Sequence, residues 1–280
     1  MINHPRISIV TPSFNQKDFL EYTILSVLEQ GYPNLEYIVM DGGSTDGSVE
    51  IIQKYARHLT YWQSQPDGGQ VEAINAGFEM ATGEIWTFLN SDDFLLEGAI
   101  AHMAEMSKAY PEAVGWVGGG YSITEDGYII HTRLPQKLDR DNLADWGENW
   151  FNQPGCFFSA EAARTVGFLD PAYHLAFDFE FWLRLTSIGE LIPTTKIIAA
   201  STIHLDAKTQ KNKAEIYREN QAVQIAQGYE ALAQSTQKYI NQTSSQTLAG
   251  TLAKLLFVTH HQKKFAPDHY VRFPSKPDDV

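Results

Sequence analysis

The sequence has little of several things that would mark particular classes of protein. Its one cysteine, Cys156, excludes an internal disulfide and a zinc site built on several cysteines. No apolar run reaches the roughly 18 to 20 residues that a bilayer-spanning helix needs. Basic residues are also scarce, since 21 lysines and arginines face 34 aspartates and glutamates, for a net charge of −13. That balance argues against a general nucleic-acid binder, although it permits a local site for a small anion.

Two nucleotide-binding signatures are missing as well. The GxGxxG fingerprint is absent from the turns after the first two strand-like segments, and the phosphate loop GxxxxGK[ST] occurs nowhere. The start MINHPRISIV has no signal-peptide pattern. A single thiol suits a reducing compartment, so we expect a cytoplasmic protein.

What the chain does have, up to about residue 100, is an alternation of strand-like and helical patterns. Strands are predicted at RISIVTP, LEYIVMD, LTYWQS and EIWTFLN, with helices between them. Such an order predicts an α/β fold with a mostly parallel sheet covered on both faces. These sheets bind ligands beyond the carboxyl ends of their strands. Thr11, Asp41, Asp92 and Asp93 each follow a predicted strand, so we expect them along one edge.

The pattern becomes mixed in the second half. Paired strands are predicted at VGWVGGGYSI and GYIIHTRL, helices at 161–166 and 178–187, and another strand at KIIAAS. A polar helix at 211–232, a linker at NQTSSQT and an amphipathic helix at 248–262 would follow. We therefore expect three parts: a ligand-binding half at 1–110, the other half of the same domain at 111–210, and a helical extension at 211–280.

The adjacent carboxylates Asp92 and Asp93 in FLNSDDF are the first chemical signal. Like charges side by side repel and lose hydration on burial, so a positive group would have to meet them. Paired carboxylates at a strand end hold a hard divalent cation such as Mg²⁺ or Mn²⁺. That cation would neutralise a departing diphosphate. The competing interpretation is that one of the acids caps the helix that follows.

Four blocks, in this order, resemble the N-terminal half of the family 2 glycosyltransferases, which have the GT-A fold. They are TPSFNQ, DGGSTDGS, PDGGQVEAINAGFEMATGEI and FLNSDD. SDD stands at the family's DxD metal motif, with Ser91 in place of the first acid. The resemblance implies Asp93 as the direct metal ligand, Asp92 as a nucleotide or sugar contact, and Mn²⁺ or Mg²⁺ as the cofactor.

The same resemblance implies roles for other residues of the first half. Thr11, Pro12 and Asp41 would line the nucleotide pocket, and Asp67 would lie near the nucleotide or the donor sugar. UDP is the default nucleotide. The competing interpretation is that these residues belong to tight strand-to-helix turns with a capping acid.

The second half supplies a candidate base. An inverting glycosyl transfer needs a base at the acceptor hydroxyl, opposite the leaving diphosphate. In HLAFDFEFWLRL, Asp178 matches the family position of that base, and Glu180 is the alternative. The plain interpretation is that Asp178 caps a helix, and both roles are compatible.

Two further segments resemble parts of the family's site. NQPGCFFS resembles the loop that borders the acceptor pocket, where Gln153 and Gly155 would form the floor and Trp150 would stack on a sugar ring. STIHLDAKTQ implies His204 as a ligand of the metal or diphosphate, and Lys208 as a phosphate contact. A lone histidine is also commonly structural.

These features predict an inverting, metal-dependent glycosyltransferase. Its partners would be a nucleotide-sugar donor and a glycan or lipid-linked acceptor, in surface polysaccharide or glycolipid assembly. The alternatives are a non-catalytic nucleotide-sugar or glycan-binding protein and a nucleotidyltransferase, although TPSFNQKD lacks the glycine- and basic-rich loop of the latter. The basic and aromatic tail KLLFVTHHQKKFAPDHYVRF predicts peripheral contact with an anionic membrane, or else a closing helix or an oligomer contact.

Overall fold

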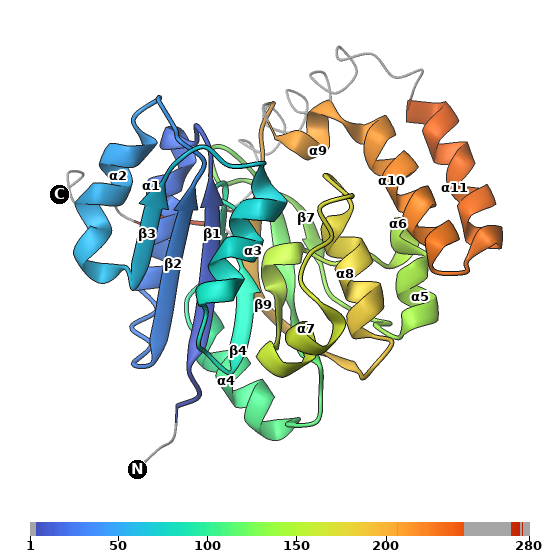
Figure 1. The fold of residues 1–280 in the computed structure, drawn as a ribbon, viewed down its shortest axis with the longest axis horizontal. Coiled ribbons are helices and arrows are strands. Elements are labelled where there is room, and N and C mark those ends of the chain that lie inside the picture. The colour runs from blue at the N-terminus through green and yellow to red at the C-terminus, as the bar shows by residue number, and fades with distance from the viewer. Residues whose placement is uncertain (1–3, 206, 244–269, 275, 277–280) are drawn as a thin grey trace.

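The computed structural model describes residues 4–205, 207–243, 270–274 and 276 (Figure 1). One nine-stranded sheet runs through the molecule in the order β3-β2-β1-β4-β8-β6-β9-β5, with β7 paired to β6. Most of the predicted linker, the helix at 248–262 and most of the tail lie outside the described residues. The strands are β1 (Ile7–Ser13), β2 (Leu35–Asp41), β3 (Tyr61–Ser64), β4 (Ile85–Phe88), β5 (Asp93–Leu95), β6 (Gly115–Thr124), β7 (Ile129–Arg133), β8 (Cys156–Ser159) and β9 (Leu191–Ile203).

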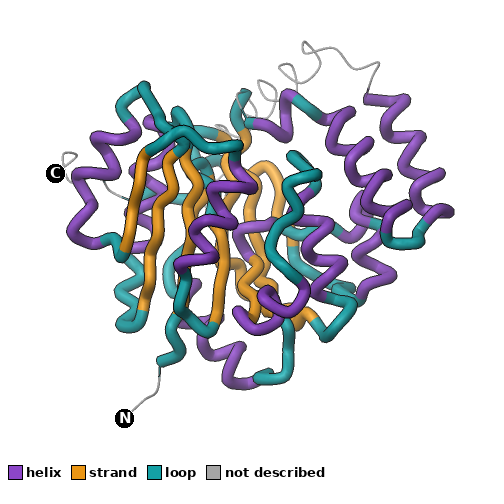
Figure 2. The backbone as a smooth tube through the Cα atoms, viewed as in Figure 1, coloured by secondary structure: helices purple, strands orange, loops and turns teal. Residues whose placement is uncertain are grey.

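Helices cover both faces of this sheet (Figure 2). The α-helices are α1 (Lys17–Leu28), α2 (Ser48–Tyr55), α3 (Gln70–Met80), α4 (Ala99–Ala109), α5 (Arg140–Ala144), α6 (Trp146–Asn149), α7 (Ala160–Val166), α8 (Phe177–Leu185), α9 (Lys208–Lys211), α10 (Lys213–Ala226) and α11 (Glu230–Thr243). Two 3₁₀ turns are η1 (Ala56–His58) and η2 (Gln153–Gly155). No helix in these described ranges is long and apolar enough to cross a bilayer.

The strand directions divide the sheet. β1 pairs in parallel with β2 and β4, and β2 with β3, as βαβ crossovers require. β8 lies antiparallel between β4 and β6, β9 runs parallel to β6, and β5 is antiparallel to β9. The predicted α/β fold, parallel in its first half and mixed in its second, is confirmed.

Alternate residues of a strand point to opposite faces, so one strand feeds two cores. In β1, Val10 joins the core under α3, α7 and α8, whereas Ile9 joins the core under α1, α2 and α4. The second core includes Leu20 of α1 and Ile52 of α2. Both cores hold the strand ends, and therefore the site, in place.

Gly77 shows how closely α3 packs on the sheet. A Cβ at Gly77 would stand 2.4 Å from Cγ1 of Val10. Alanine in a helix is favoured over glycine by about 1 kcal/mol, but overpacking a core costs about 1–3 kcal/mol. We expect Gly77→Ala to lower the free energy of unfolding, measured by urea titration. Gly147→Ala is the control, because its nearest neighbour is an atom of Tyr239 at 3.7 Å; equal effects of the two changes would contradict this packing.

Several sequence predictions are wrong in detail. The helix predicted at 211–232 is broken at Gly228, whose φ of +84° suits glycine, so that α10 and α11 are separate. Neither acid of SDD caps a helix, because Asp93 begins β5 and α4 begins only at Ala99. The N-cap of α8 is Ala176, not the predicted Asp178.

Candidate active site

Asp93 is a buried carboxylate at the end of the sheet. It opens β5 opposite Ser201 of β9. Its carboxyl accepts hydrogen bonds from Nδ2 of Asn90 at 3.2 Å, from the Ser201 hydroxyl and from the Thr202 backbone N–H. Burial, and then repulsion from Asp92, raise the pKa of Asp93 well above its ordinary value. Every one of these donors is neutral, so within the described ranges the ionised form of Asp93 would have no cationic partner.

Asp92 lies beside the two groups that the sequence placed near the diphosphate. Nε2 of His204 is 3.0 Å from Oδ2 of Asp92, and the buried His204 ring packs on Phe19 at 4.5 Å. Burial lowers the pKa of Lys208, while the charges of Asp92 and Asp67 oppose that shift. The structure therefore brings Asp92, His204, Lys208 and Asp67 into one neighbourhood.

Two amide side chains, those of Gln70 and Asn90, join this cluster, and no sequence motif assigns a role to either. Lys208 Nζ donates to Gln70 at 2.8 Å, and Gln70 Nε2 donates to Asn90 Oδ1 at 2.7 Å. Asn90 in turn donates to Asp93 and, at 3.3 Å, to Gln153. The feature of the sequence that could identify them is their position, because Gln70 begins a helix and Asn90 follows a strand within the family-like blocks. Gln70 and Asn90 thus form a hydrogen-bonded bridge from Lys208 to Asp93 at the edge of the sheet.

A pocket of about 500 Å³ lies against this bridge. Its walls are the start of α3, the loop before α8 and Lys208. It is lined by Gly68, Gly69, Gln70, Val71, Glu72, Asn75, Pro171, His174 and Lys208. Residues about 140 positions apart in sequence thus border one space.

The predicted nucleotide-binding acids lie at the neighbouring strand ends. Asp41 is buried, and its carboxylate accepts from the backbone N–H groups of Gly43 and Ser44 at 3.1 and 2.9 Å. A Cβ at Gly42 would stand 3.1 Å from Oδ2 of Asp67, so the loops after β2 and β3 touch. Asp41 therefore holds the loop that follows β2 in place, and Asp67, in the loop that follows β3, contacts it.

Thr11 and Pro12 are placed differently. Both are buried within β1, and the Thr11 hydroxyl lies 3.1 Å from the hydroxyl of Tyr37. The Thr11 side chain is therefore bonded inside the protein, and only the strand end that it belongs to reaches the edge.

Asp178 occupies the first turn of α8. The neighbouring Phe177 packs on Phe88 at the end of β4, with ring centroids 5.9 Å apart. Oδ1 of Asp178 accepts from the Phe179 N–H at 2.7 Å. Burial raises the pKa of Asp178 to about 6, which suits a general base. The same surroundings, together with the Asp178 charge, raise the pKa of the buried Cys156 thiol, as expected for an unreactive cysteine.

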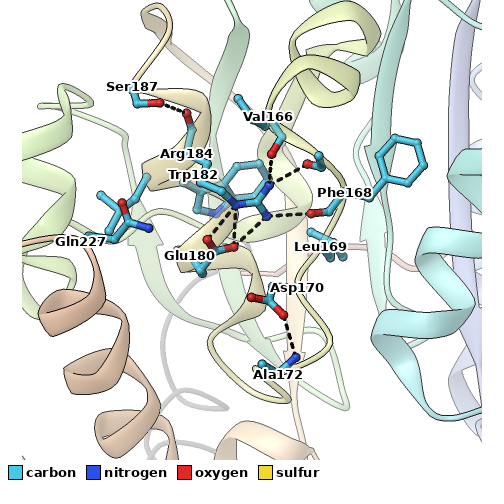
Figure 3. A network of polar contacts seen from close by, with 12 residues as sticks. Val166, Phe168, Leu169, Asp170, Ala172, Glu180, Trp182, Arg184, Ser187 and Gln227 are labelled. Atoms are coloured by element: carbon cyan, nitrogen blue, oxygen red, sulfur yellow. Dashed lines mark hydrogen bonds and ion pairs between the residues drawn. The ribbon is translucent and has the colours of Figure 1, made fainter.

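Glu180 is engaged in a different interaction (Figure 3). Nε of Arg184 donates to both carboxylate oxygens of Glu180, at 2.7 and 2.9 Å, and Nη2 donates at 2.7 Å. The same guanidinium donates to the carbonyl oxygens of Val166, Gly167 and Phe168. This ion pair ties α8 to the end of α7, and it favours Asp178 over Glu180 as the base.

The predicted acceptor residues are also separated. Gln153 lies in the cluster and donates to the Phe88 carbonyl at 2.8 Å. Gly155 is buried, and a Cβ there would stand 2.8 Å from the carbonyl oxygen of Gly118. The Arg133 guanidinium lies 4.2 Å above the Trp150 ring and covers one of its faces. Any sugar on Trp150 would use the other face.

The acids fit a cation that is shared with a substrate. Across the described ranges, no three histidine, cysteine, aspartate or glutamate side chains gather into a complete metal site. The buried, uncompensated carboxylate of Asp93 nevertheless supplies the oxygen ligand that Mg²⁺ and Mn²⁺ prefer. Mg²⁺ commonly takes only one or two protein carboxylates and completes its shell with water and substrate phosphates.

Comparison with solved structures supports the architecture. A mannosyltransferase of Pyrobaculum calidifontis, solved with GDP-Man and Mn²⁺, matches with a TM-score of 0.64 at 17% identity, over 95% of this chain and 82% of that one. Staphylococcus aureus TarS 1–349, solved with UDP-GlcNAc, matches with a TM-score of 0.62 at 15% identity, over 84% and 70%. These likenesses show the fold, which is GT-A.

Curated relatives are glycosyltransferases. An uncharacterised glycosyltransferase of Mycobacterium tuberculosis is 34% identical over 193 residues, 68% of this chain and 72% of the relative. TuaG of Bacillus subtilis, named for teichuronic acid biosynthesis, is 37% identical over 49% of this chain and 56% of its own. A GalNAc(5)-diNAcBac-PP-undecaprenol beta-1,3-glucosyltransferase of Campylobacter jejuni is 33% identical over 49% and 45%. The family model described as glycosyl transferase family 2 matches residues 8–166. The chain therefore belongs to the family 2 glycosyltransferases.

Proposed function

We propose that this protein transfers a sugar, with inversion, from a nucleotide-diphosphate donor to a hydroxyl of a glycan or lipid-linked acceptor. UDP is the default nucleotide. The observation that carries the proposal is the buried Asp93 without a cationic partner, next to Asp92, which contacts His204 and whose charge acts on Lys208. The names of the Bacillus and Campylobacter relatives support a role in surface polysaccharide or glycolipid assembly. Such an acceptor would bring the protein to a membrane surface.

Donor binding falls to the strand ends of the first half. Asp93, with Asp92 beside it, would hold a divalent cation, Mn²⁺ or Mg²⁺, that neutralises charge on the leaving diphosphate. Lys208 adds a positive charge on the pocket side, and His204 orients Asp92. The loops that contain Asp41 and Asp67, together with the end of β1 at Thr11 and Pro12, would bind the nucleotide.

Acceptor activation falls to the second half. Asp178 takes the proton from the acceptor hydroxyl as the oxygen attacks the anomeric carbon and the bond to the diphosphate breaks on the opposite side. The proton ends on Asp178, the bonding electrons leave with the diphosphate, and no covalent intermediate forms. Gln153 and the open face of Trp150 border the acceptor. Residues 1–110 would thus serve the donor and 111–210 the acceptor and base, with His204 and Lys208 also on the donor side. The described part of the helical extension is α10 and α11.

Calorimetric titration with UDP, GDP and dTDP, in Mn²⁺ and then in excess EDTA, tests this proposal. We expect one nucleotide to bind in a metal-dependent way. Asp93→Asn should weaken that binding by at least about tenfold, since even losing a partner of a metal ligand costs ~10- to 100-fold. Asp126→Asn, an equal charge change in the exposed turn after β6, is the control.

The outcomes separate the parts of the proposal. Binding that survives EDTA or Asp93→Asn would contradict the metal assignment alone. If the folded protein bound no nucleotide and turned over no donor, the transferase proposal would fail, and a glycan-binding role on the same fold would replace it.

A further inference from the structure

A carboxylate of the helical extension reaches the segment that leads into α8. Glu219 of α10 accepts through Oε2 from the backbone N–H groups of Leu175 at 2.8 Å and Ala176 at 2.9 Å. Its Oε1 accepts from the N–H of His174 at 3.2 Å. Three successive backbone donors therefore converge on one half-buried side chain more than 40 residues away in sequence.

These contacts lie at the N-terminus of α8, where the N-cap residue Ala176 makes no side-chain capping bond. Glu219 bonds the N–H of Ala176 and of the two residues before it, and so holds the chain where it enters the helix. A carboxylate at this end also complements the positive end of the helix dipole. Asp178 lies only two residues beyond the last N–H that Glu219 holds. The position of Asp178 therefore depends on α10.

The same segment forms part of the pocket wall. His174 and Pro171 line the pocket of about 500 Å³, opposite the start of α3 and Lys208. Glu219 thus holds both the wall on this side and the helix that carries the candidate base. α10 also packs on α8 directly and on α11 (Figure 1).

We propose that Glu219 is a positioning residue that holds residues 174–176 so that Asp178 faces the acceptor hydroxyl. The inference rests on the proposed role of Asp178 as base, and it makes α10 part of the catalytic unit. Glu219 itself stays away from the reacting atoms and acts through Asp178.

The charges around Asp178 give this role an electrostatic signature. The charge of Glu219 adds to the burial that raises the pKa of Asp178. The other ionisable groups on elements near α8 are neutral or have partners of their own. Cys156 of β8 is a protonated thiol, Arg140 of α5 bonds the Leu183 carbonyl, and Arg164 of α7 covers the Trp86 ring. Glu180 and Arg184 pair with each other, and Tyr173 and His174 belong to the segment that leads into α8. Removing the Glu219 charge should therefore make Asp178 easier to ionise.

Amide hydrogen exchange tests the holding contact without any substrate. In Glu219→Ala, exchange at residues 174–176 should become at least about tenfold faster, because three bonds to a charged acceptor are lost. Exchange in β1 and β2 should stay as in wild type. Glu215→Ala is the control, since Glu215 lies one turn earlier on α10 and pairs with the exposed Arg218. Unchanged exchange at 174–176 in Glu219→Ala would overturn the proposal.

Kinetics test the effect on the base. With the best donor, Glu219→Ala should lower kcat by about 10- to 100-fold through misplacement of Asp178, with nucleotide Kd unchanged. Glu219→Gln keeps one acceptor oxygen, so it should restore part of kcat while its acid limb moves to lower pH. If the wild-type protein turns over and both variants keep its kcat and the pH of its acid limb, the proposal is overturned. Absence of turnover in the wild type would instead overturn the proposed function, and the base role with it.

Discussion

Asp178→Asn is expected to abolish turnover and to stabilise the protein at neutral pH. Removing a general base typically costs about 10²- to 10⁴-fold in rate. Asparagine keeps Oδ1, so the bond from the Phe179 N–H at 2.7 Å is retained. It removes a charge that is unfavourable in this half-buried position, because desolvation raises the pKa of Asp178 to about 6. The ionised carboxylate of Asp178 is therefore expected to favour catalysis and to lower stability at neutral pH.

The stabilisation should depend on pH in a defined sense. The folded protein holds the Asp178 proton up to about pH 6, whereas the unfolded chain releases it near the ordinary value of 3.8. The stability that protonated Asp178 contributes to the wild-type protein is therefore lost between these two values as pH rises, and this loss is complete above about pH 6. The difference corresponds to at most about 3 kcal/mol. Asp178→Asn should match wild type near pH 4 and exceed it at pH 7.5.

Urea unfolding at pH 4 and 7.5, beside kcat measurements, checks both effects. Asp139→Asn is the matched control: Asp139 caps α5, and asparagine is an equally good cap. Bonds from Asn142 lower the pKa of Asp139, so its replacement should bring no gain in stability and no loss of turnover. An Asp178→Asn protein that turns over at the wild-type rate would rule out Asp178 as the base.

Arg184→Met is expected to cause the largest loss of stability. Breaking a buried ion pair by removing one partner costs about 3–5 kcal/mol, because the other charge stays buried and unpaired. Here the side chain of Glu180 is only 6% exposed, and three carbonyl oxygens of the α7–α8 connection also lose their donor. Methionine preserves much of the apolar stem. The midpoint of urea unfolding, with the slope held in common, measures the change.

Two further variants show whether the cost comes from burial. Arg218→Met removes the partner of Glu215 from a pair whose side chains are 53% and 52% exposed, and should cost at most about 1 kcal/mol. Adding Glu180→Gln to Arg184→Met removes the stranded charge and should recover part of the loss. Equal effects of Arg184→Met and Arg218→Met would contradict the structural role of Figure 3.

The first half of the fold was predictable from periodicity. LEYIVMD coincides with β2, and the helix between β3 and β4 follows from its apolar spacing. Two short strands were harder to predict: β8 has four residues and β5 has three, and no strand is expected from the sequence at either place. In one interpretation of the sequence, an acid at the start of β5 caps a helix. The strand-end rule still points to Asp92 and Asp93, because both follow the strand predicted at EIWTFLN.

The candidate site was predictable in its charged members and not in its supporting ones. Asp92, His204 and Lys208, to which the SDD and STIHLDAKTQ segments assign roles, lie in one neighbourhood. The amides Gln70 and Asn90 carry no charge to draw attention, and their bond joins residues 20 positions apart. Glu219 sits in a polar helix with no motif, and its contacts depend wholly on how α10 packs.

The place of β8 in the sheet has a consequence for synthesis on the ribosome. β8 separates β4 from β6, so β4 keeps an open edge until residue 159 has emerged. Exposed strand edges pair readily with other chains. A nascent chain of 110 residues would hold all four acids that we propose for donor binding and still lack the strand that lies beside β4. The first half of the chain therefore completes its sheet only with β8 from the second half.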